Sequence, residues 1–204
     1  ATNCMRRARD GTLHIYPKDQ ERKYNIGLKR FFDEGLTLSQ IHHPNIVNVS
    51  NFLRFNNTAY LVMRFEQGKD LRWFIKNTEY VPDEEFILSV FSMVLAGLKE
   101  VHKNGFLHLD MKPSNILLRA SGVPLILDLG AAFKVPKSDA QKVHTLTHGY
   151  SSPEQHKKEP LSYSSDLYAV AMTIRACIMH HSPPSAIKRM KKDTVRMMSD
   201  THAK

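Results

Sequence analysis

Residues 108–115 have the sequence HLDMKPSN, the most informative motif of this chain. Its spacing, His-x-Asp-x-x-x-x-Asn, places a carboxylate at Asp110, a cation at Lys112 and an amide at Asn115 in one polar loop between apolar segments. A lone His-Leu-Asp is more often a strand that ends in a turn. The interpretation of this stretch therefore depends on what precedes and follows it in the chain.

The groups in this loop match the needs of phosphoryl transfer from ATP: a carboxylate that orients the attacking hydroxyl, a cation near the moving phosphoryl group, and oxygen ligands for Mg²⁺. We expect Asp110 to act as the base, Lys112 to neutralise charge on the γ-phosphate, and Asn115 to bind Mg²⁺. Asp128, the first residue of an Asp-Leu-Gly segment, follows an apolar strand and is the other expected metal ligand. Gly130 lets the chain turn behind it.

Two further signals follow in the order that this interpretation requires. Residues 147–154, THGYSSPE, combine Thr147 with a Ser-Pro-Glu segment that ends at Glu154. Asp166 then opens a segment whose apolar residues recur at helical spacing as far as Ile178, which predicts a buried helix. Each signal is weak alone, since Asp-Leu-Gly is a common tripeptide, but the ordered set is specific.

Upstream of the loop, the sequence predicts a helix and a pair of strands. Apolar residues at helical spacing over residues 28–41 indicate an amphipathic helix that ends before Pro44. Glu34 lies on its apolar face, where a carboxylate needs a cationic partner; from the residues alone, a position at the wet edge of that face is favoured. Residues 46–55 and 58–65 are β-rich, and the two asparagines between them suit a tight hairpin turn.

The middle of the chain continues with helices and a second strand pair. A short helical stretch is predicted over residues 70–81, and acidic residues then begin a long helix over residues 83–103 that ends before Gly105. Short strands are predicted at 115–118 and 124–127. Helices thus predominate in the second half of an α+β fold.

Length and composition limit the classes of protein to which this chain can belong. With 204 residues, 42% of them hydrophobic, we expect one domain or two closely packed lobes. The net charge of +9 suggests an acidic partner, but the 29 scattered Lys and Arg residues lack interleaved aromatics, so a solvated basic surface and no nucleic-acid partner are expected. The apolar runs are too short for a membrane segment, which favours a cytoplasmic protein. Cys4 and Cys177 form no Cys-x-x-Cys pair and are expected to be free thiols.

Taken together, these motifs resemble the eukaryotic-like serine/threonine protein kinase family, from about Phe31 to Ile178, and look most like its bacterial members. The resemblance implies a two-lobed kinase-like α+β fold. Residues 1–65 would be the remnant of an incomplete small lobe with helix C, and 66–70 the hinge. Residues 71–204 would be a mainly helical large lobe through helix F, without its last helices.

The resemblance also implies ATP and Mg²⁺ as cofactors and a protein substrate with a Ser or Thr hydroxyl. It makes Glu34 the helix C glutamate that pairs with a strand lysine, Met63 the gatekeeper and Leu117 the floor of the adenine pocket. The nucleotide-binding residues that it implies are Glu34, Met63, Phe65, Glu66, Asp70, Leu117 and Asp128. The implied structural or regulatory residues are His108, Leu129, Gly130, Thr147, Glu154 and Asp166, with Leu38, Val49, His108 and Leu129 as a spine between the lobes.

The sequence also departs from the family pattern. The glycine-rich loop and the strand lysine that should precede Glu34 are missing, which we interpret as truncation at both ends, so that the fragment itself is expected to be poorly stable and inactive. Glu154 is expected to lack its usual arginine partner. Leu109 replaces an arginine that often pairs with a phosphorylated residue, so activation is expected not to depend on phosphorylation at Ser138, Thr145 or Thr147.

Three functions remain open at this stage. The first is an ATP-dependent protein serine/threonine kinase with Asp110 as the base. The second is a pseudokinase or scaffold, because the sequence lacks a complete ATP clamp. The third is a small-molecule phosphotransferase of the aminoglycoside type, which shares the loop spacing, although Lys112 and the Ser-Pro-Glu segment argue against it.

Overall fold

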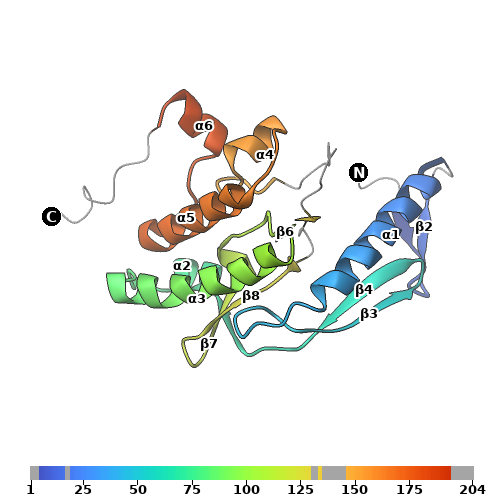
Figure 1. The fold of residues 1–204 in the computed structure, drawn as a ribbon, viewed down its shortest axis with the longest axis horizontal. Helices are drawn as coiled ribbons and strands as arrows, with labels where there is room; N and C mark the ends of the chain where they lie inside the picture. Colours follow the sequence, from blue (N-terminus) through green and yellow to red (C-terminus); the bar gives the residue numbers. More distant parts are fainter. Residues whose placement is uncertain (1–4, 17–18, 130–132, 135–145, 194–204) are drawn as a thin grey trace. The chain divides into compact units, whose positions relative to one another are not determined.

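The chain forms two compact units in a computed structural model that describes residues 5–16, 19–129, 133–134 and 146–193. The first unit comprises residues 1–66 and the second comprises residues 67–204. Figure 1 colours the first unit in blue shades and the second from green to red.

The first unit contains one long helix and two antiparallel strand pairs. Its elements are β1 (Met5–Arg7), β2 (Leu13–Ile15), α1 (Asp19–Leu38), β3 (Val49–Phe55) and β4 (Thr58–Met63). β1 pairs with β2, and β3 pairs with β4 in the register Phe55↔Thr58. Asn56 and Asn57 adopt φ angles of 52° and 56°, the left-handed pair that a two-residue type I′ hairpin requires, which confirms the predicted turn.

Helix α1 packs on the β3–β4 pair and is longer than predicted (Figure 1). It begins at Asp19 and ends at Leu38 rather than Ile41. The early start was not predicted, because the polar residues of the first turns suit a helix but carry no apolar stripe. The rings of Phe31 and Phe32 lie 5.5 and 4.7 Å from the ring of Phe52 on β3. A Cβ at Gly35 would lie 2.5 Å from the Phe52 ring, so only glycine lets the helix approach the strand this closely.

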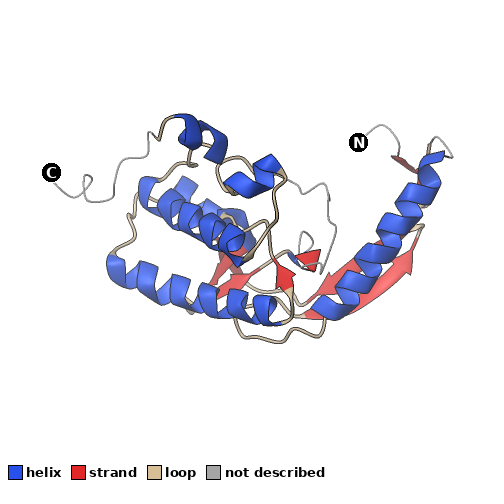
Figure 2. Cartoon of the chain, turned by 45° about the horizontal axis from the view of Figure 1, so that its top comes forward, coloured by secondary structure: helices blue, strands red, loops and turns tan. Residues whose placement is uncertain are grey.

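The second unit is mainly helical, with short strands between its helices (Figure 2). Its elements are β5 (Gly68–Asp70), α2 (Leu71–Asn77), α3 (Glu84–Lys103), β6 (Phe106–Leu107), the 3₁₀ turn η2 (Pro113–Asn115), β7 (Ile116–Arg119), β8 (Pro124–Ile126), β9 (Phe133–Lys134), α4 (Pro153–Lys157), α5 (Tyr163–Met179) and α6 (Ala186–Lys191). β5, β7 and β8 form one antiparallel sheet, and β6 pairs with β9.

The core of this unit lies where α3, α5 and the β5–β7–β8 sheet meet. Val94 and Leu98 on the predicted apolar stripe of α3 are fully buried, and they belong to the same cluster as Met111, Ile116 and Ala169. Burying a side chain of this size stabilises the fold by roughly 1.5–3 kcal/mol. The core therefore holds the loop between β6 and β7 against both long helices.

The predicted boundaries of α3 are confirmed and have a local cause. The Asp83 carboxylate accepts a hydrogen bond from the Phe86 N–H at 2.8 Å and so caps the first turn, while Glu84 and Glu85 follow it. At the other end, Gly105 has a φ of 78°, which ends the helix after Asn104.

Several elements of the structure were not predicted. The strands β1, β2, β5, β6 and β9 are two or three residues long, too short to show a period of two. The short helix α6 at residues 186–191 was not predicted either, because its six residues carry no apolar periodicity. Gly149 explains the tight packing of the segment before α4: its φ is 85°, and a Cβ there would lie 2.4 Å from the Pro183 carbonyl oxygen.

None of the helices among the described residues is long and apolar enough to span a membrane.

Candidate active site

The polar loop of residues 108–115 connects β6 to β7 in the second unit, and η2 forms its last turn. Its apolar residues Leu109 and Met111 point into the core, with 4% and 0% exposure. The polar residues between them are thereby held close together, because every second side chain is anchored.

Asp110 lies at the centre of this loop and is 9% exposed. Its Oδ1 accepts a hydrogen bond from Thr147 Oγ1 at 2.6 Å, and its Oδ2 lies 2.6 Å from Lys112 Nζ. Asn115 Nδ2 donates to the Asp110 carbonyl at 2.9 Å and to Oδ2 at 3.2 Å. The structure thus brings together the three residues predicted to be catalytic and also Thr147, from 37 residues further along the chain.

His108 supports the backbone of Asp110 from below. Its Nδ1 accepts the Asp110 N–H at 3.3 Å, and its Nε2 lies 3.3 Å from the Leu127 carbonyl oxygen. A carbonyl only accepts, so both contacts are satisfied by the neutral tautomer with its proton on Nε2. The predicted structural role of His108 therefore has a physical basis in the second unit, where its side chain is fully buried.

The fully buried carboxylate of Asp166, in the first turn of α5, holds the loop from the other side. It accepts the backbone N–H groups of His108 and Leu109 at 2.8 and 2.7 Å, and it lies 2.7 Å from His102 Nε2 on α3. The sequence predicted Asp166 but gave no sign of His102, which lies on α3 at its last turn. The position near a helix N-terminus also favours the negative charge of Asp166.

Gln155 is a site residue that sequence reasoning missed. Leu109 has a φ of 61°, a left-handed conformation that is unfavourable for leucine. Its N–H is held by Asp166, and its carbonyl accepts a hydrogen bond from the buried Gln155 Nε2 at 3.1 Å. The spacing of Ser152 and Gln155, a capping box at the start of α4, is the sequence signal that marks Gln155 as oriented.

Asn115 and Asp128 lie at the same end of the β7–β8 hairpin. Ile116 pairs with Ile126, and the Leu127 N–H donates to the Asn115 carbonyl at 2.8 Å, so the residues that flank the hairpin are neighbours. Asn115 directs its Nδ2 to Asp110, and its Oδ1, which accepts a hydrogen bond from Ser114 Oγ at 3.5 Å, is the oxygen that a cation could take. Asp128 has a φ of 53°, an unusual conformation of the kind found at functional sites.

These two side chains fit Mg²⁺, which is commonly bound by one or two protein oxygens together with phosphate oxygens. The described residues contain no group of three or more His, Cys, Asp or Glu placed to hold a metal ion. The magnesium-binding role of Asn115 and Asp128 stays a prediction.

The predicted nucleotide-binding residues are divided between the two units. Met63 ends β4, Phe65 is 86% exposed, and Glu66 lies 3.8 Å from Arg64 in the first unit. Asp70 and Leu117 are directly paired across β5 and β7 in the second unit. The nucleotide-binding role of this set stays a prediction.

Glu34 and Leu38 lie in α1, and their side chains are outside the part of the chain that the structure describes. The nucleotide-binding role of Glu34 and the spine of Leu38, Val49, His108 and Leu129 stay predictions. Gly130, Ser138 and Thr145 lie outside the described residues. Asp70 has a contact that is shown: its Oδ1 accepts the Trp73 N–H at 2.7 Å and caps α2.

Glu154 has a hydrogen-bonding partner that the sequence did not predict. Its Oε1 accepts a hydrogen bond from Ser165 Oγ on α5 at 2.5 Å. Burial by itself raises the pKa of the Glu154 carboxyl, but the hydrogen bonds, first among them that of Ser165, outweigh this effect and lower the pKa below 4.5. The contact joins α4 to α5 behind the loop.

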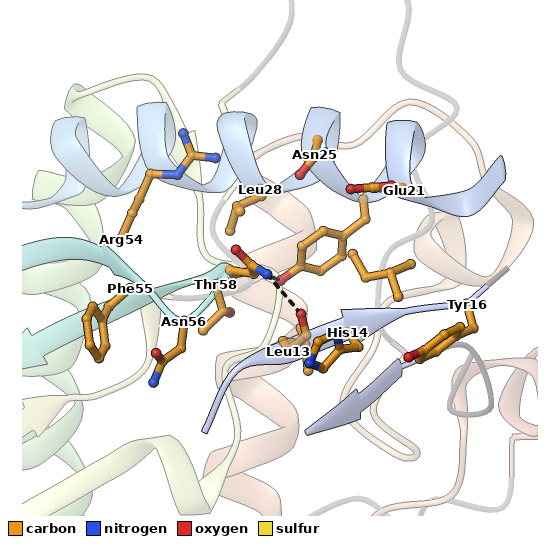
Figure 3. A pocket seen from close by; sticks show the side chains of 13 residues that line it. Leu13, His14, Tyr16, Glu21, Asn25, Leu28, Arg54, Phe55, Asn56 and Thr58 are labelled. Atoms are coloured by element: carbon orange, nitrogen blue, oxygen red, sulfur yellow. Dashed lines mark hydrogen bonds between the residues drawn. The ribbon is translucent and has the colours of Figure 1, made fainter. Parts of the chain in front are cut away.

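Cavities occur in both units. In the first unit, a cavity of about 710 Å³ lies between β2, α1 and the β3–β4 turn, next to the hydrogen bond from Asn57 Nδ2 to the Leu13 carbonyl (Figure 3). It contains none of the predicted site residues. In the second unit, a cavity of about 460 Å³ is lined by Lys112 and Thr147, and so adjoins Asp110.

The sequence profile described as "Protein kinase domain" matches residues 8–203 of the chain. Among curated proteins, the chain is 29% identical over 152 residues to the probable serine/threonine-protein kinase PknB of Lactococcus lactis, and the match covers 74% of this chain and 24% of that protein. It is 31% identical over 159 residues to a probable serine/threonine-protein kinase of Clostridium perfringens, with 77% and 23% covered.

Two further relatives extend these matches. The serine/threonine-protein kinase PknD of Mycobacterium tuberculosis is 26% identical over 193 residues, which cover 86% of this chain and 29% of that protein. The chain thus spans about a quarter of the length of the curated relatives that it matches. Among solved structures, the one titled "PpkA-294 apo form" matches with a TM-score of 0.78 and 24% identity over 98% of this chain and 71% of that chain, which supports the fold.

Proposed function

Because the chain belongs to the protein kinase domain family, we propose that the protein transfers the γ-phosphoryl group of ATP to a Ser or Thr hydroxyl of a protein. The membership confirms the expected family and fold, and several of the curated relatives are bacterial. The observation that carries the proposal is the carboxylate of Asp110, held by Lys112, Asn115 and Thr147.

The mechanism follows from the contacts of Asp110. Its carboxylate orients the substrate hydroxyl and takes its proton while the oxygen forms a bond to the γ-phosphorus and the bond to the β-phosphate oxygen breaks. Thr147 and Asn115 fix the carboxylate by donating to its two oxygens, so little reorganisation is needed when the substrate binds.

Lys112 supplies the positive charge in this arrangement. Its Nζ lies 2.6 Å from Asp110 Oδ2, and therefore close to the oxygen that attacks and to the phosphoryl group that moves. A lysine at this position stabilises the negative charge that the transferring oxygens carry. Asn115 and Asp128 would hold Mg²⁺, which would supply positive charge to the phosphate oxygens.

The choice of Ser or Thr over Tyr as the acceptor rests on Lys112 and Thr147. Both side chains contact Asp110, and the family resemblance associates this pair with Ser and Thr acceptors. The protein kinase relatives named above carry the description serine/threonine.

Two alternative functions can be distinguished from the proposed one by experiment. A pseudokinase or scaffold would bind partners without phosphoryl transfer, and the sequence feature that motivates it is the absence of a Gly-x-Gly-x-x-Gly loop and strand lysine in these 204 residues. A small-molecule phosphotransferase would phosphorylate an aminoglycoside but no protein.

The decisive experiment measures transfer of labelled γ-phosphate from ATP to a mixed protein substrate by the full-length natural protein. We expect Asp110→Ala to lower kcat at least about 100-fold, since a positioned base contributes roughly that much or more. Glu79→Gln, an exposed charge loss on the same unit, serves as the matched control and should retain activity. Circular dichroism checks that both variants fold.

Full transfer by folded Asp110→Ala would refute the proposal. Transfer to an aminoglycoside alone would support the small-molecule function, and nucleotide or partner binding without any transfer by the unmodified protein would support the scaffold.

A further inference from the structure

The cavity of about 460 Å³ beside Asp110 has a pronounced charge character. It is bounded by α2, by the loop around Lys112, by the segment that contains Thr147, and by the C-terminal end of α5. Six basic side chains line it, namely Arg72, Lys76, Lys112, His148, His180 and His181. No Asp or Glu is among its described lining residues.

Two of the cationic side chains are available for a ligand. The Lys112 charge is matched by the Asp110 carboxylate at 2.6 Å. Arg72 and Lys76, in contrast, are exposed, and no ion pair joins either of them to a carboxylate of the described residues. They are four residues apart on α2, so they lie on one face of the helix and point to the same side of the cavity.

The cavity has a closely packed apolar floor. Buried Tyr150 clusters with Met172 and Ala176 of α5, and Ile75 of α2 packs against that cluster. Gly149, next to His148, lies against Pro183, where a Cβ would be 2.4 Å from the carbonyl oxygen. The cavity therefore combines an apolar floor with a cationic rim beside the base, as an extended peptide with an anionic side chain would require.

We propose, on the basis of the function proposed above, that this protein prefers acceptor Ser or Thr residues next to an anionic side chain, with Arg72 and Lys76 as its binding residues. A carboxylate or a phosphate on the substrate meets the same pair, since both ligands have oxygens that accept from guanidinium and ammonium groups. The specificity thus resides in α2, outside the motifs that identify the site.

The experiment compares peptides of one length that differ only at the residues around a central serine: Glu-rich, Gln-rich, Lys-rich, and one with a neighbouring phosphoserine. The full-length protein is assayed for KM and kcat with each peptide at low and physiological salt. We expect the lowest KM with an anionic peptide, and a rise in that KM with salt, because exposed charge pairs are screened. The Glu and phosphoserine peptides separate carboxylate from phosphate as the preferred anion.

The charge pair is tested by the double variant Arg72→Gln/Lys76→Gln. We expect its KM for the anionic peptides to rise about tenfold, with kcat unchanged and the Gln peptide unaffected. The double variant Lys99→Gln/Lys191→Gln loses the same charge from exposed positions outside the cavity and should match the unmodified protein. Arg72→Glu/Lys76→Glu should reverse the preference toward the Lys peptide.

A direct binding measurement separates this inference from the proposed function. Fluorescence anisotropy of labelled peptides without ATP should show tighter binding of the anionic peptides, which the Arg72→Gln/Lys76→Gln variant loses, whether or not transfer occurs. Equal binding and equal KM for all peptides would overturn the proposed preference for anionic peptides. Transfer of phosphate to any of these peptides would still uphold the kinase function. Charge-selective binding with no transfer to any peptide or protein would uphold the site and overturn the function.

Discussion

Replacement of Gln155 by glutamate tests whether the strained backbone before the base is held in place by a side chain. Gln155 accepts the Ser152 N–H at 2.9 Å and donates to the Leu109 carbonyl at 3.1 Å, and its exposed fraction is 3%. Gln155→Glu keeps the shape and the acceptor, but it places a second oxygen against the carbonyl oxygen of Leu109. One hydrogen bond is replaced by a repulsive contact in a buried position.

The magnitude follows from these contacts. Loss of a hydrogen bond with an unsatisfied buried carbonyl costs about 1–3 kcal/mol, and burial of an unpaired carboxylate adds to it, so we expect unfolding free energy to fall by about 3 kcal/mol. Leu109 at φ 61° is also free to relax toward an ordinary conformation, which moves the peptide that precedes Asp110. We expect kcat to fall about 10- to 100-fold while the KM for ATP changes less than about twofold, as a misplaced base would cause.

The measurements are guanidinium unfolding followed by circular dichroism, and steady-state transfer from ATP below the unfolding range. Gln67→Glu, an exposed isosteric change in the same unit, is the control for stability. Gln155→Met leaves the Ser152 N–H and the Leu109 carbonyl without partners but adds no charge. Its stability should lie between those of the unmodified protein and Gln155→Glu, and its loss of kcat should equal that of Gln155→Glu. If Gln155→Glu unfolds within about 0.5 kcal/mol of the unmodified protein and keeps its kcat, the positioning role of Gln155 is refuted.

Two other predictions concern pH and thiol chemistry. The pKa of Glu154 is lowered in the folded protein, so the ionised carboxylate stabilises the fold above its unfolded pKa of 4.5, and this contribution is lost as the pH falls through the folded pKa. In unfolding titrations, the stability difference between the unmodified protein and Glu154→Gln should be constant near pH 7 and shrink below pH 4.5. A difference that does not change with pH would contradict the lowered pKa. Burial raises the pKa of the Cys177 thiol to about 12, so in a Cys4→Ser variant the remaining thiol should react with iodoacetamide at pH 8 only after denaturation, and rapid alkylation of the folded protein would show that the thiol is not buried.

The elements that the sequence predicted well are those with local signals. The hairpin turn at Asn56 and Asn57, the cap of α3 at Asp83 and its end before Gly105 each depend on the conformational preference of a few adjacent residues. The start of α1 was placed nine residues late, because the first turns of that helix have no apolar stripe to mark them. The two- and three-residue strands were missed, since pairing with a distant strand forms them rather than any local pattern.

In the candidate site, too, features with a local signal were predicted and contacts between distant residues were not. The spacing of Asp110, Lys112 and Asn115 was sufficient to predict that they lie together, because groups so close in sequence cannot lie far apart in space. Thr147 was predicted by resemblance to the family, but its hydrogen bond to Asp110 Oδ1 spans 37 residues and was not foreseen. The contacts of His102 with Asp166 and of Gln155 with Leu109 join separate elements, and no periodicity or motif in the sequence predicted them.

By itself, the sequence determined the family, the residues of the polar loop that meet at Asp110, and the helices and turns with strong local preferences. Only the tertiary structure decided which side chains hold Leu109 in its unfavourable conformation, and that Arg72 and Lys76 line a cavity beside Asp110. The physical reason is that hydrogen bonds and charges act over a few ångströms in space, whereas the groups that they join here lie tens of residues apart along the chain.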